Sequence, residues 1–168
     1  MMLEVAVDAD EEWDSSRSWE DLARKAARAA IAESDYAELA DAERTVEISV
    51  TLTGDEQVRA LNSEWRGKDK PTNVLSFPMA DEHDLGRASF AGPELLLGDI
   101  ILAHGVCEAE ASEKGVTVEQ HAAHLLVHGT LHLLGYDHHD DREAVAMEAR
   151  EVRALARLGI ANPYEVTA

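Results

Sequence analysis

The sequence has few of the features that mark secreted or membrane proteins. Cys107 is the only cysteine among 168 residues, which excludes a disulfide within the chain and fits a reducing compartment. No run of 18 or more apolar residues is present, and residues 1–14 are acidic rather than basic and then apolar. We therefore expect no transmembrane span, no secretory signal and a cytoplasmic location.

Positive charge is also scarce. Lys and Arg together number 15, against 34 Asp and Glu, which gives a net charge of −19. Such a charge promotes solubility and disfavours wide, non-specific binding to nucleic acids or anionic membranes. A nucleic-acid substrate would therefore have to bind at a local basic patch.

The length and the apolar patterns predict one α/β domain covering residues 1–168. Alternating or continuous apolar runs predict strands at 3–8, 46–52, 74–77 and 95–103, the last interrupted at Gly98-Asp99. Helical spacing and capping residues predict helices at about 18–36, 54–65, 104–114, 117–134 and 140–158. Residues 80–94 are polar and are expected to form a long loop. On the helix that follows Gly54, Trp65 is expected to face the core.

The strongest chemical signal is the stretch 128–138, His-Gly-Thr-Leu-His-Leu-Leu-Gly-Tyr-Asp-His. His128 and His132 are four residues apart, so on a helix both rings project from one face. Gly135 can take the left-handed conformation that ends a helix, which lets the chain turn back and bring His138 to the same point. Three imidazoles with an open fourth position are typical of a catalytic zinc site. We predict one Zn²⁺ per chain, bound by His128, His132 and His138.

Two other functions fit the same stretch. Its histidine and glycine spacing matches that of metzincin peptidases, but Gly129 stands where those enzymes have the Glu that acts as general base. A zinc peptidase is therefore one alternative, and an assembly factor with a structural metal site is another. His124 could also pair with His128 in place of His132, although Gly135 favours the 128/132 pair. We expect His124 to lie beside the site, where it contacts substrate or supports a ligand.

Three sequence segments, taken in order, resemble one known family. They are RGKDKPTNVLSFP (Arg66–Pro78), LLGDI (Leu96–Ile100) and the stretch 128–138. Together they are similar to the YbeY family of bacterial endoribonucleases, also called rRNA maturation factors. The resemblance covers roughly residues 45–165. It implies an α/β domain with a small, mostly parallel mixed sheet flanked by helices, one of which carries the metal ligands as in metzincins.

The resemblance also implies a function. It indicates a metal-dependent hydrolase that cleaves single-stranded RNA in ribosomal RNA maturation, including processing of the 16S rRNA 3′ end, and in ribosome quality control. Implied partners are rRNA, components of the small ribosomal subunit and a ribosome-associated GTPase. It assigns metal binding to His128, His132 and His138, and an essential role to Arg66.

The chemistry of the basic residues suggests how they would act on RNA. The guanidinium of Arg66 matches two phosphate oxygens and would stabilise charge that develops in the transition state, so we count it with His128 as catalytic. Lys68 and Lys70 would extend the positive rim along the RNA backbone. The nucleophile, either a hydroxide at the metal or the 2′-hydroxyl of the substrate, stays open.

Overall fold

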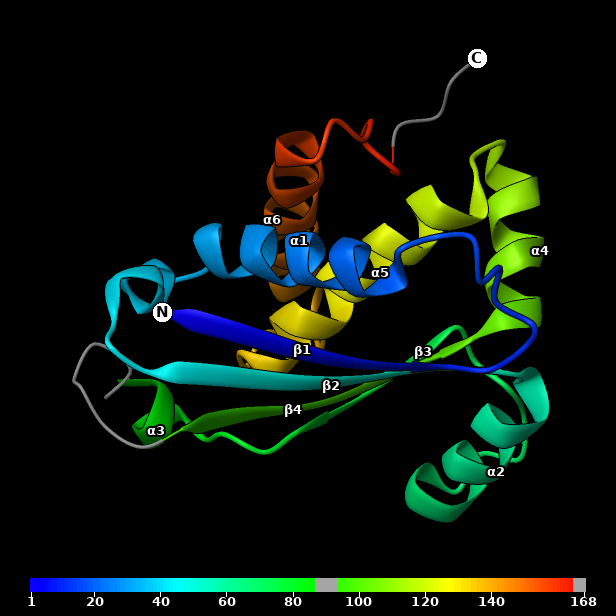
Figure 1. The fold of residues 1–168 in the computed structure, drawn as a ribbon, viewed down its shortest axis with the longest axis horizontal. Coiled ribbons are helices and arrows are strands. Elements are labelled where there is room, and N and C mark those ends of the chain that lie inside the picture. Colours follow the sequence, from blue (N-terminus) through cyan, green and yellow to red (C-terminus); the bar gives the residue numbers. More distant parts are fainter. Residues whose placement is uncertain (87–93, 165–168) are drawn as a thin grey trace.

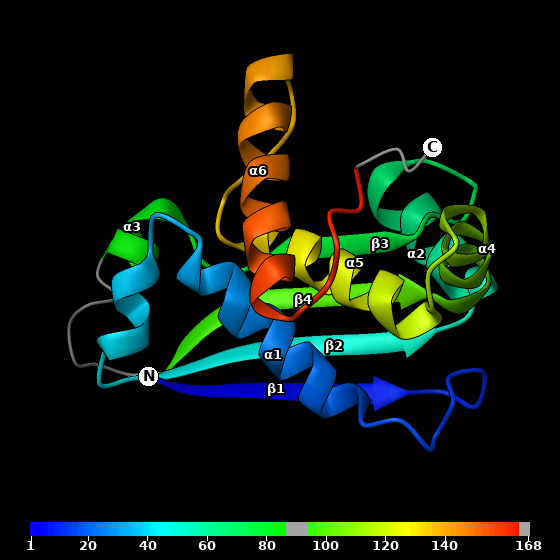
Figure 2. The same cartoon turned by 90° about the horizontal axis from the view of Figure 1, so that it is seen from above.

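The computed structural model describes residues 1–86 and 94–164 (Figures 1 and 2). Its strands are β1 (Met2–Ala9), β2 (Thr45–Thr53), β3 (Val74–Pro78) and β4 (Leu95–Ala103). Its helices are α1 (Trp19–Ala32), α2 (Asp55–Arg66), α3 (Glu82–Gly86), α4 (His104–Lys114), α5 (Val118–Leu133) and α6 (Asp141–Arg157), with a 3₁₀ turn, η1 (Ala37–Asp41). Among the described residues, none of these helices is long and apolar enough to cross a membrane.

The strands form a mixed sheet in the order β1-β2-β4-β3. β1 pairs parallel with β2 and β2 pairs parallel with β4, whereas β3 runs antiparallel to β4 at the edge. Helices α1, α5 and α6 lie over one face of this sheet (Figure 1), and α2 closes a small apolar cluster with β3 and β4. The predicted α/β fold with a small, mostly parallel sheet is confirmed.

The start of α5 follows from its first residues. Thr117 Oγ1 accepts a hydrogen bond from the Gln120 amide at 3.1 Å, and Gln120 Oε1 accepts one from the Thr117 amide at 3.0 Å. This capping box satisfies two amides that the helix itself leaves free. It fixes where the helix that carries His128 and His132 begins.

Three local predictions were wrong. Strand β4 continues through Gly98, because the missing side chain lets β3 approach: a Cβ there would lie 2.2 Å from the Phe77 carbonyl oxygen. Within the expected loop 80–94, residues 82–86 form α3, where the Asp81 carboxylate accepts a hydrogen bond from the Asp84 amide; residues 87–93 lie outside the described residues. Trp65 is exposed rather than packed on the core.

Candidate metal centre

Helix α5 carries His128 and His132 and packs closely against the sheet at Gly129. A Cβ at position 129 would lie 3.0 Å from Ile100 Cγ2 and 3.1 Å from Ser76 Oγ, both of which belong to the sheet. The position that holds the general base in metzincins therefore faces β3 and β4, with no room for a glutamate side chain. This close packing argues against the peptidase alternative.

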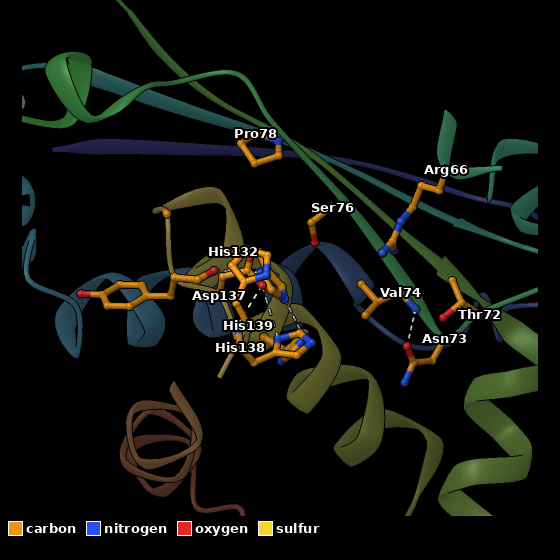
Figure 3. Close-up of a pocket in the computed structure, with 13 residues that line it drawn as sticks. Arg66, Thr72, Asn73, Val74, Ser76, Pro78, His132, Asp137, His138 and His139 are labelled. Carbon is orange, nitrogen blue, oxygen red and sulfur yellow. Dashed lines mark hydrogen bonds and ion pairs between the residues drawn. The ribbon is translucent and has the colours of Figure 1, made fainter. Parts of the chain in front are cut away.

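The structure brings the three predicted histidines together. One nitrogen from each of His128, His132 and His138 lies within 4.8 Å of the others. His128 and His132 project from one face of α5, with their Nε2 atoms 3.0 Å apart. After α5 the chain reverses at Gly135, whose φ of +95° is the left-handed conformation that the sequence predicted. The reversal carries His138 back to the helical pair (Figure 3).

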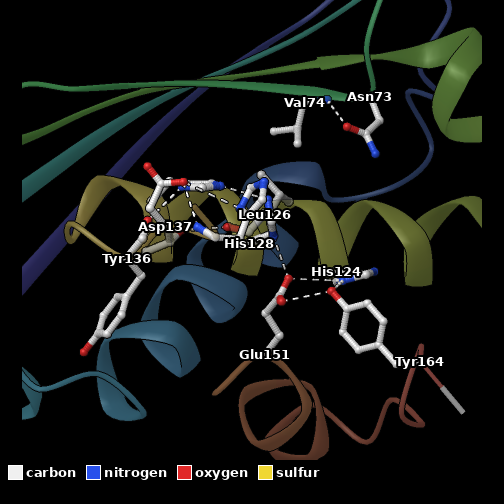
Figure 4. A network of polar contacts seen from close by, with 12 residues as sticks. Asn73, Val74, His124, Leu126, His128, Tyr136, Asp137, Glu151 and Tyr164 are labelled. Atoms are coloured by element: carbon white, nitrogen blue, oxygen red, sulfur yellow. Dashed lines mark hydrogen bonds and ion pairs between the residues drawn. The ribbon is translucent and has the colours of Figure 1, made fainter. Parts of the chain in front are cut away.

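Hydrogen bonds determine which nitrogen of each helical histidine carries its proton. His128 Nδ1 lies 2.7 Å from Oε1 of Glu151, a buried residue of α6 (Figure 4). Burial alone would raise the pKa of Glu151, but hydrogen bonds from His124 and His128 outweigh it and lower that pKa to about 2. The ionised carboxylate can only accept, so His128 Nδ1 must donate. His132 Nδ1 likewise donates to the Tyr136 carbonyl oxygen at 2.8 Å.

These two hydrogen bonds leave both Nε2 atoms without a proton in the neutral imidazoles. Burial and the neighbouring His128 lower the pKa of His132 to about 4, so its ring is neutral at physiological pH. When both imidazoles are neutral, two nitrogen lone pairs face each other at 3.0 Å, an arrangement that a cation between them would stabilise. Zinc–nitrogen bonds of 2.0–2.1 Å in a tetrahedron place ligand nitrogens about 3.3 Å apart. The donor set therefore fits a divalent metal, with His138 as the third ligand.

A buried polar network supports His128 from behind. Glu151 Oε2 accepts a hydrogen bond from the Tyr164 hydroxyl at 2.9 Å, while burial and the Glu151 charge raise the pKa of Tyr164 and keep that hydroxyl protonated. His124 Nε2 lies 3.1 Å from the same hydroxyl and 3.3 Å from Glu151 Oε1 (Figure 4). His124 is only 6% exposed and does not line the cavity that contains the three histidines; it contacts the carboxylate that accepts from His128.

The sequence reasoning missed Glu151 and Tyr164. One signal was present for Glu151: it lies on the apolar stripe of α6 with Met147 and Leu155, four residues from each. A carboxylate at a core position is costly unless it is hydrogen-bonded, so it points to a buried partner. Tyr164 follows the last helix and showed no comparable pattern.

The three histidines line a cavity of about 600 Å³, and Arg66 lines the same cavity. Arg66 is the last residue of α2, one residue beyond the predicted end of that helix, because Gly67 ends the helix with a φ of +67°. Its side chain and Ser76 lie across the cavity from His132 and His138 (Figure 3). Asp137 and His139 also line the cavity, whereas Lys68 and Lys70 are exposed outside it.

The Glu151–His128 contact leads to a first prediction. In Glu151→Gln the side chain keeps its size but loses the charge that fixes the His128 proton on Nδ1. Metal affinity should fall on the order of 10- to 100-fold, as when other carboxylate partners of ligand histidines are removed. Zinc affinity can be measured by competition with a chromophoric chelator. Glu148→Gln, on the exposed side of the same helix, is the matched control. Equal affinities in the two variants would contradict a role for Glu151 in positioning His128.

Comparison with known proteins places the chain among endoribonucleases. Residues 7–159 match the family model described as Endoribonuclease YbeY. A relative of that name from Rhizorhabdus wittichii is 54% identical over 167 residues, covering 99% of both proteins. Another, from Sphingopyxis alaskensis, is 53% identical over 165 residues, covering 97% of this chain and 98% of the relative. The similarity therefore includes the N-terminal 44 residues, where no motif was recognised.

A solved structure supports the fold independently. The solution structure of TM1509 from Thermotoga maritima aligns with a TM-score of 0.54 and 22% identity. The alignment covers 97% of this chain and 100% of that protein. At this level of identity the match concerns the arrangement of helices and strands alone.

Proposed function

Since the chain belongs to the YbeY family of endoribonucleases, it is a nuclease, and we propose that it cleaves single-stranded RNA with one Zn²⁺ held by His128, His132 and His138. The observation that carries this proposal is the pair of Nε2 atoms of His128 and His132, 3.0 Å apart, in a cavity that Arg66 also lines. We further propose that the substrate is ribosomal RNA, with the 16S rRNA 3′ end as one site. By family resemblance, the enzyme would work in the cytoplasm beside small-subunit components and a ribosome-associated GTPase.

Each residue of the site has a separate role in the proposed reaction. When bound, a zinc ion at these imidazoles would polarise a phosphoryl oxygen and lower the pKa of a coordinated water. Glu151 and the Tyr136 carbonyl hold the rings of His128 and His132 so that Nε2 faces the metal position. Arg66, from the opposite wall, would bind the phosphate and stabilise the negative charge that develops on it. Ser76 contributes a hydroxyl that has no hydrogen-bond partner among the described residues.

The two lysines would act farther along the RNA. Lys68 and Lys70 are exposed and follow Arg66 on the loop after α2, outside the cavity. We propose that they bind backbone phosphates next to the one held by Arg66. Because the chain carries a net charge of −19, this short basic segment would determine where RNA can approach.

The proposed substrate class can be tested directly. Zinc-loaded protein should cleave a labelled single-stranded RNA, leave casein intact, and lose its RNA cleavage when a chelator removes the metal. Re-addition of zinc should restore the activity, which controls for irreversible unfolding by the chelator. Casein cleavage would favour the peptidase alternative. RNA cleavage that persists after complete metal removal would contradict the metal-dependent mechanism.

A further inference from the structure

Of the three tryptophans, Trp65 is the one that is not buried in the core. Trp13 and Trp19 are 2% and 6% exposed, and their indole N–H groups donate to the backbone carbonyls of Thr53 and Asp14. Trp65 is 65% exposed, and within residues 1–86 and 94–164 its indole has no hydrogen bond or ring contact. An exposed indole leaves a large apolar surface in water, so a binding partner would stabilise it.

The exposure follows from the length of α2. Leu61 and Val58, one and two turns before Trp65 on the same side of the helix, pack against the cluster of Leu75, Ile101 and Ala103. Toward its end α2 points away from the sheet (Figure 1), and Trp65, its next-to-last residue, is left exposed. A helix holds this indole in a defined place, whereas an exposed loop would not.

The residues around Trp65 indicate what kind of partner would bind it. After Gly67 the chain folds back on α2, where the Lys68 amide donates to the Asn62 carbonyl and Asn62 Nδ2 donates to the Lys70 carbonyl. This loop therefore holds its two lysines at the same end of the helix as Trp65.

The cations at this end of α2 are uncompensated. Among the described residues, no acidic side chain lies within 4.0 Å of Arg66, Lys68 or Lys70, whereas Arg59 on the same helix forms ion pairs with Asp69 and Glu56. In a chain with a net charge of −19, an exposed indole among three free cations is a distinctive surface. This surface matches a single strand of nucleic acid, whose phosphates would bind the cations and whose unpaired bases would stack on the indole.

We propose that Trp65 stacks on an unpaired base of the RNA next to the phosphate bound by Arg66. This inference rests on the proposed function, and it names the feature of the substrate that the enzyme recognises, an unpaired base. A duplex keeps its bases stacked on one another and offers the indole no free face, so the contact favours single-stranded RNA. Base stacking on an aromatic ring is tolerant of sequence, so Trp65 would select unpaired RNA without choosing a particular base.

The exposed indole provides its own probe. Rapid mixing of zinc-loaded protein with a short single-stranded RNA, recorded before cleavage accumulates, should quench the long-wavelength part of the tryptophan emission. A duplex of the same sequence, and an abasic oligonucleotide with the same number of phosphates, should quench much less. The quench should disappear in Trp65→Phe, since the two buried tryptophans stay out of reach of RNA.

Affinity and kinetics give a second readout. Trp65→Leu keeps an apolar side chain but has no aromatic face, so the dissociation constant for single-stranded RNA should rise on the order of tenfold. KM should rise with it while kcat changes little. Trp65→Phe should recover most of the affinity. Val145→Ala, which removes an equally exposed apolar side chain from α6, is the matched control and should bind RNA like the parent.

Several results would overturn the inference. Equal quenching by the abasic oligonucleotide would mean that charge alone brings RNA to this surface. Parental RNA affinity in Trp65→Leu would remove the stacking role. If the parent elutes as a dimer on size-exclusion chromatography and Trp65→Leu elutes as a monomer, a second copy of the chain covers Trp65. Each of these can occur in a parent protein that cleaves RNA, whereas failure of the parent to cleave RNA would contradict the proposed function itself.

Discussion

The His132→Ala protein is expected to lose its bound zinc and to cleave RNA more slowly by on the order of 10³-fold or more, because metal catalysis supplies several kcal/mol of transition-state stabilisation. In the parent, the Nε2 atoms of His128 and His132 face each other at 3.0 Å. Without His132 only two of the three imidazoles that surround the metal position remain. Thermal stability in the presence of zinc should also fall, because a ligand that binds only the folded chain stabilises it.

A neighbouring histidine provides the control for this experiment. His139 lines the same cavity, but its Nε2 lies 2.8 Å from the Asp137 carboxylate and its side chain is largely exposed. His139→Ala should therefore keep zinc content and most of the activity. Elemental analysis, RNA cleavage and thermal unfolding should be measured on both proteins. Full zinc occupancy in His132→Ala would mean that a different set of residues holds the metal.

Replacing Arg66 is expected to separate catalysis from metal binding. Arg66 lines the cavity from the end of α2 and belongs to a different element from all three histidines. Arg66→Ala should therefore leave zinc content and melting temperature nearly unchanged, while RNA cleavage falls by roughly 10²-fold, as when one group that stabilises transition-state charge is removed. Single-turnover rates at saturating RNA would measure the loss in the chemical step.

Two further variants define the role of the guanidinium. Arg66→Lys keeps the charge but cannot make two parallel hydrogen bonds to a phosphate, so it should recover only part of the rate. Arg59→Ala removes an arginine from the same helix that is paired with Asp69, and should cleave RNA almost like the parent. If Arg66→Ala cleaves RNA at the parental rate, the phosphate-binding role is wrong. Full biological function in that variant would then favour an assembly factor with a structural metal site.

The parts of the site that were predictable depend on local geometry. The four-residue spacing of His128 and His132 fixes their common face on any α-helix, and Gly135 marks the reversal that returns His138. The capping box at Thr117 marks the start of the helix for the same reason. These features involve contacts between residues a few positions apart, which the sequence displays directly.

The residues that were missed or misplaced depend on contacts between distant segments. Glu151 meets His128 only because α6 packs against α5, and the spacing of residues along the chain does not fix that packing. Helical spacing correctly grouped Trp65 with Val58 and Leu61, but it could not show that α2 points away from the sheet toward its end. The burial of His124 has the same origin, since Glu151 and Tyr164 cover it from α6 and the segment that follows.

Crystallographic location of zinc at its absorption edge would test the proposed metal centre most directly. An anomalous difference map of zinc-loaded protein should show one peak per chain, about 2.0–2.1 Å from Nε2 of His128, Nε2 of His132 and a ring nitrogen of His138. The fourth position should open toward Arg66 and be filled by solvent or a phosphate oxygen. A peak bound to other residues, or zinc held by His124 in place of His132, would contradict the proposed centre.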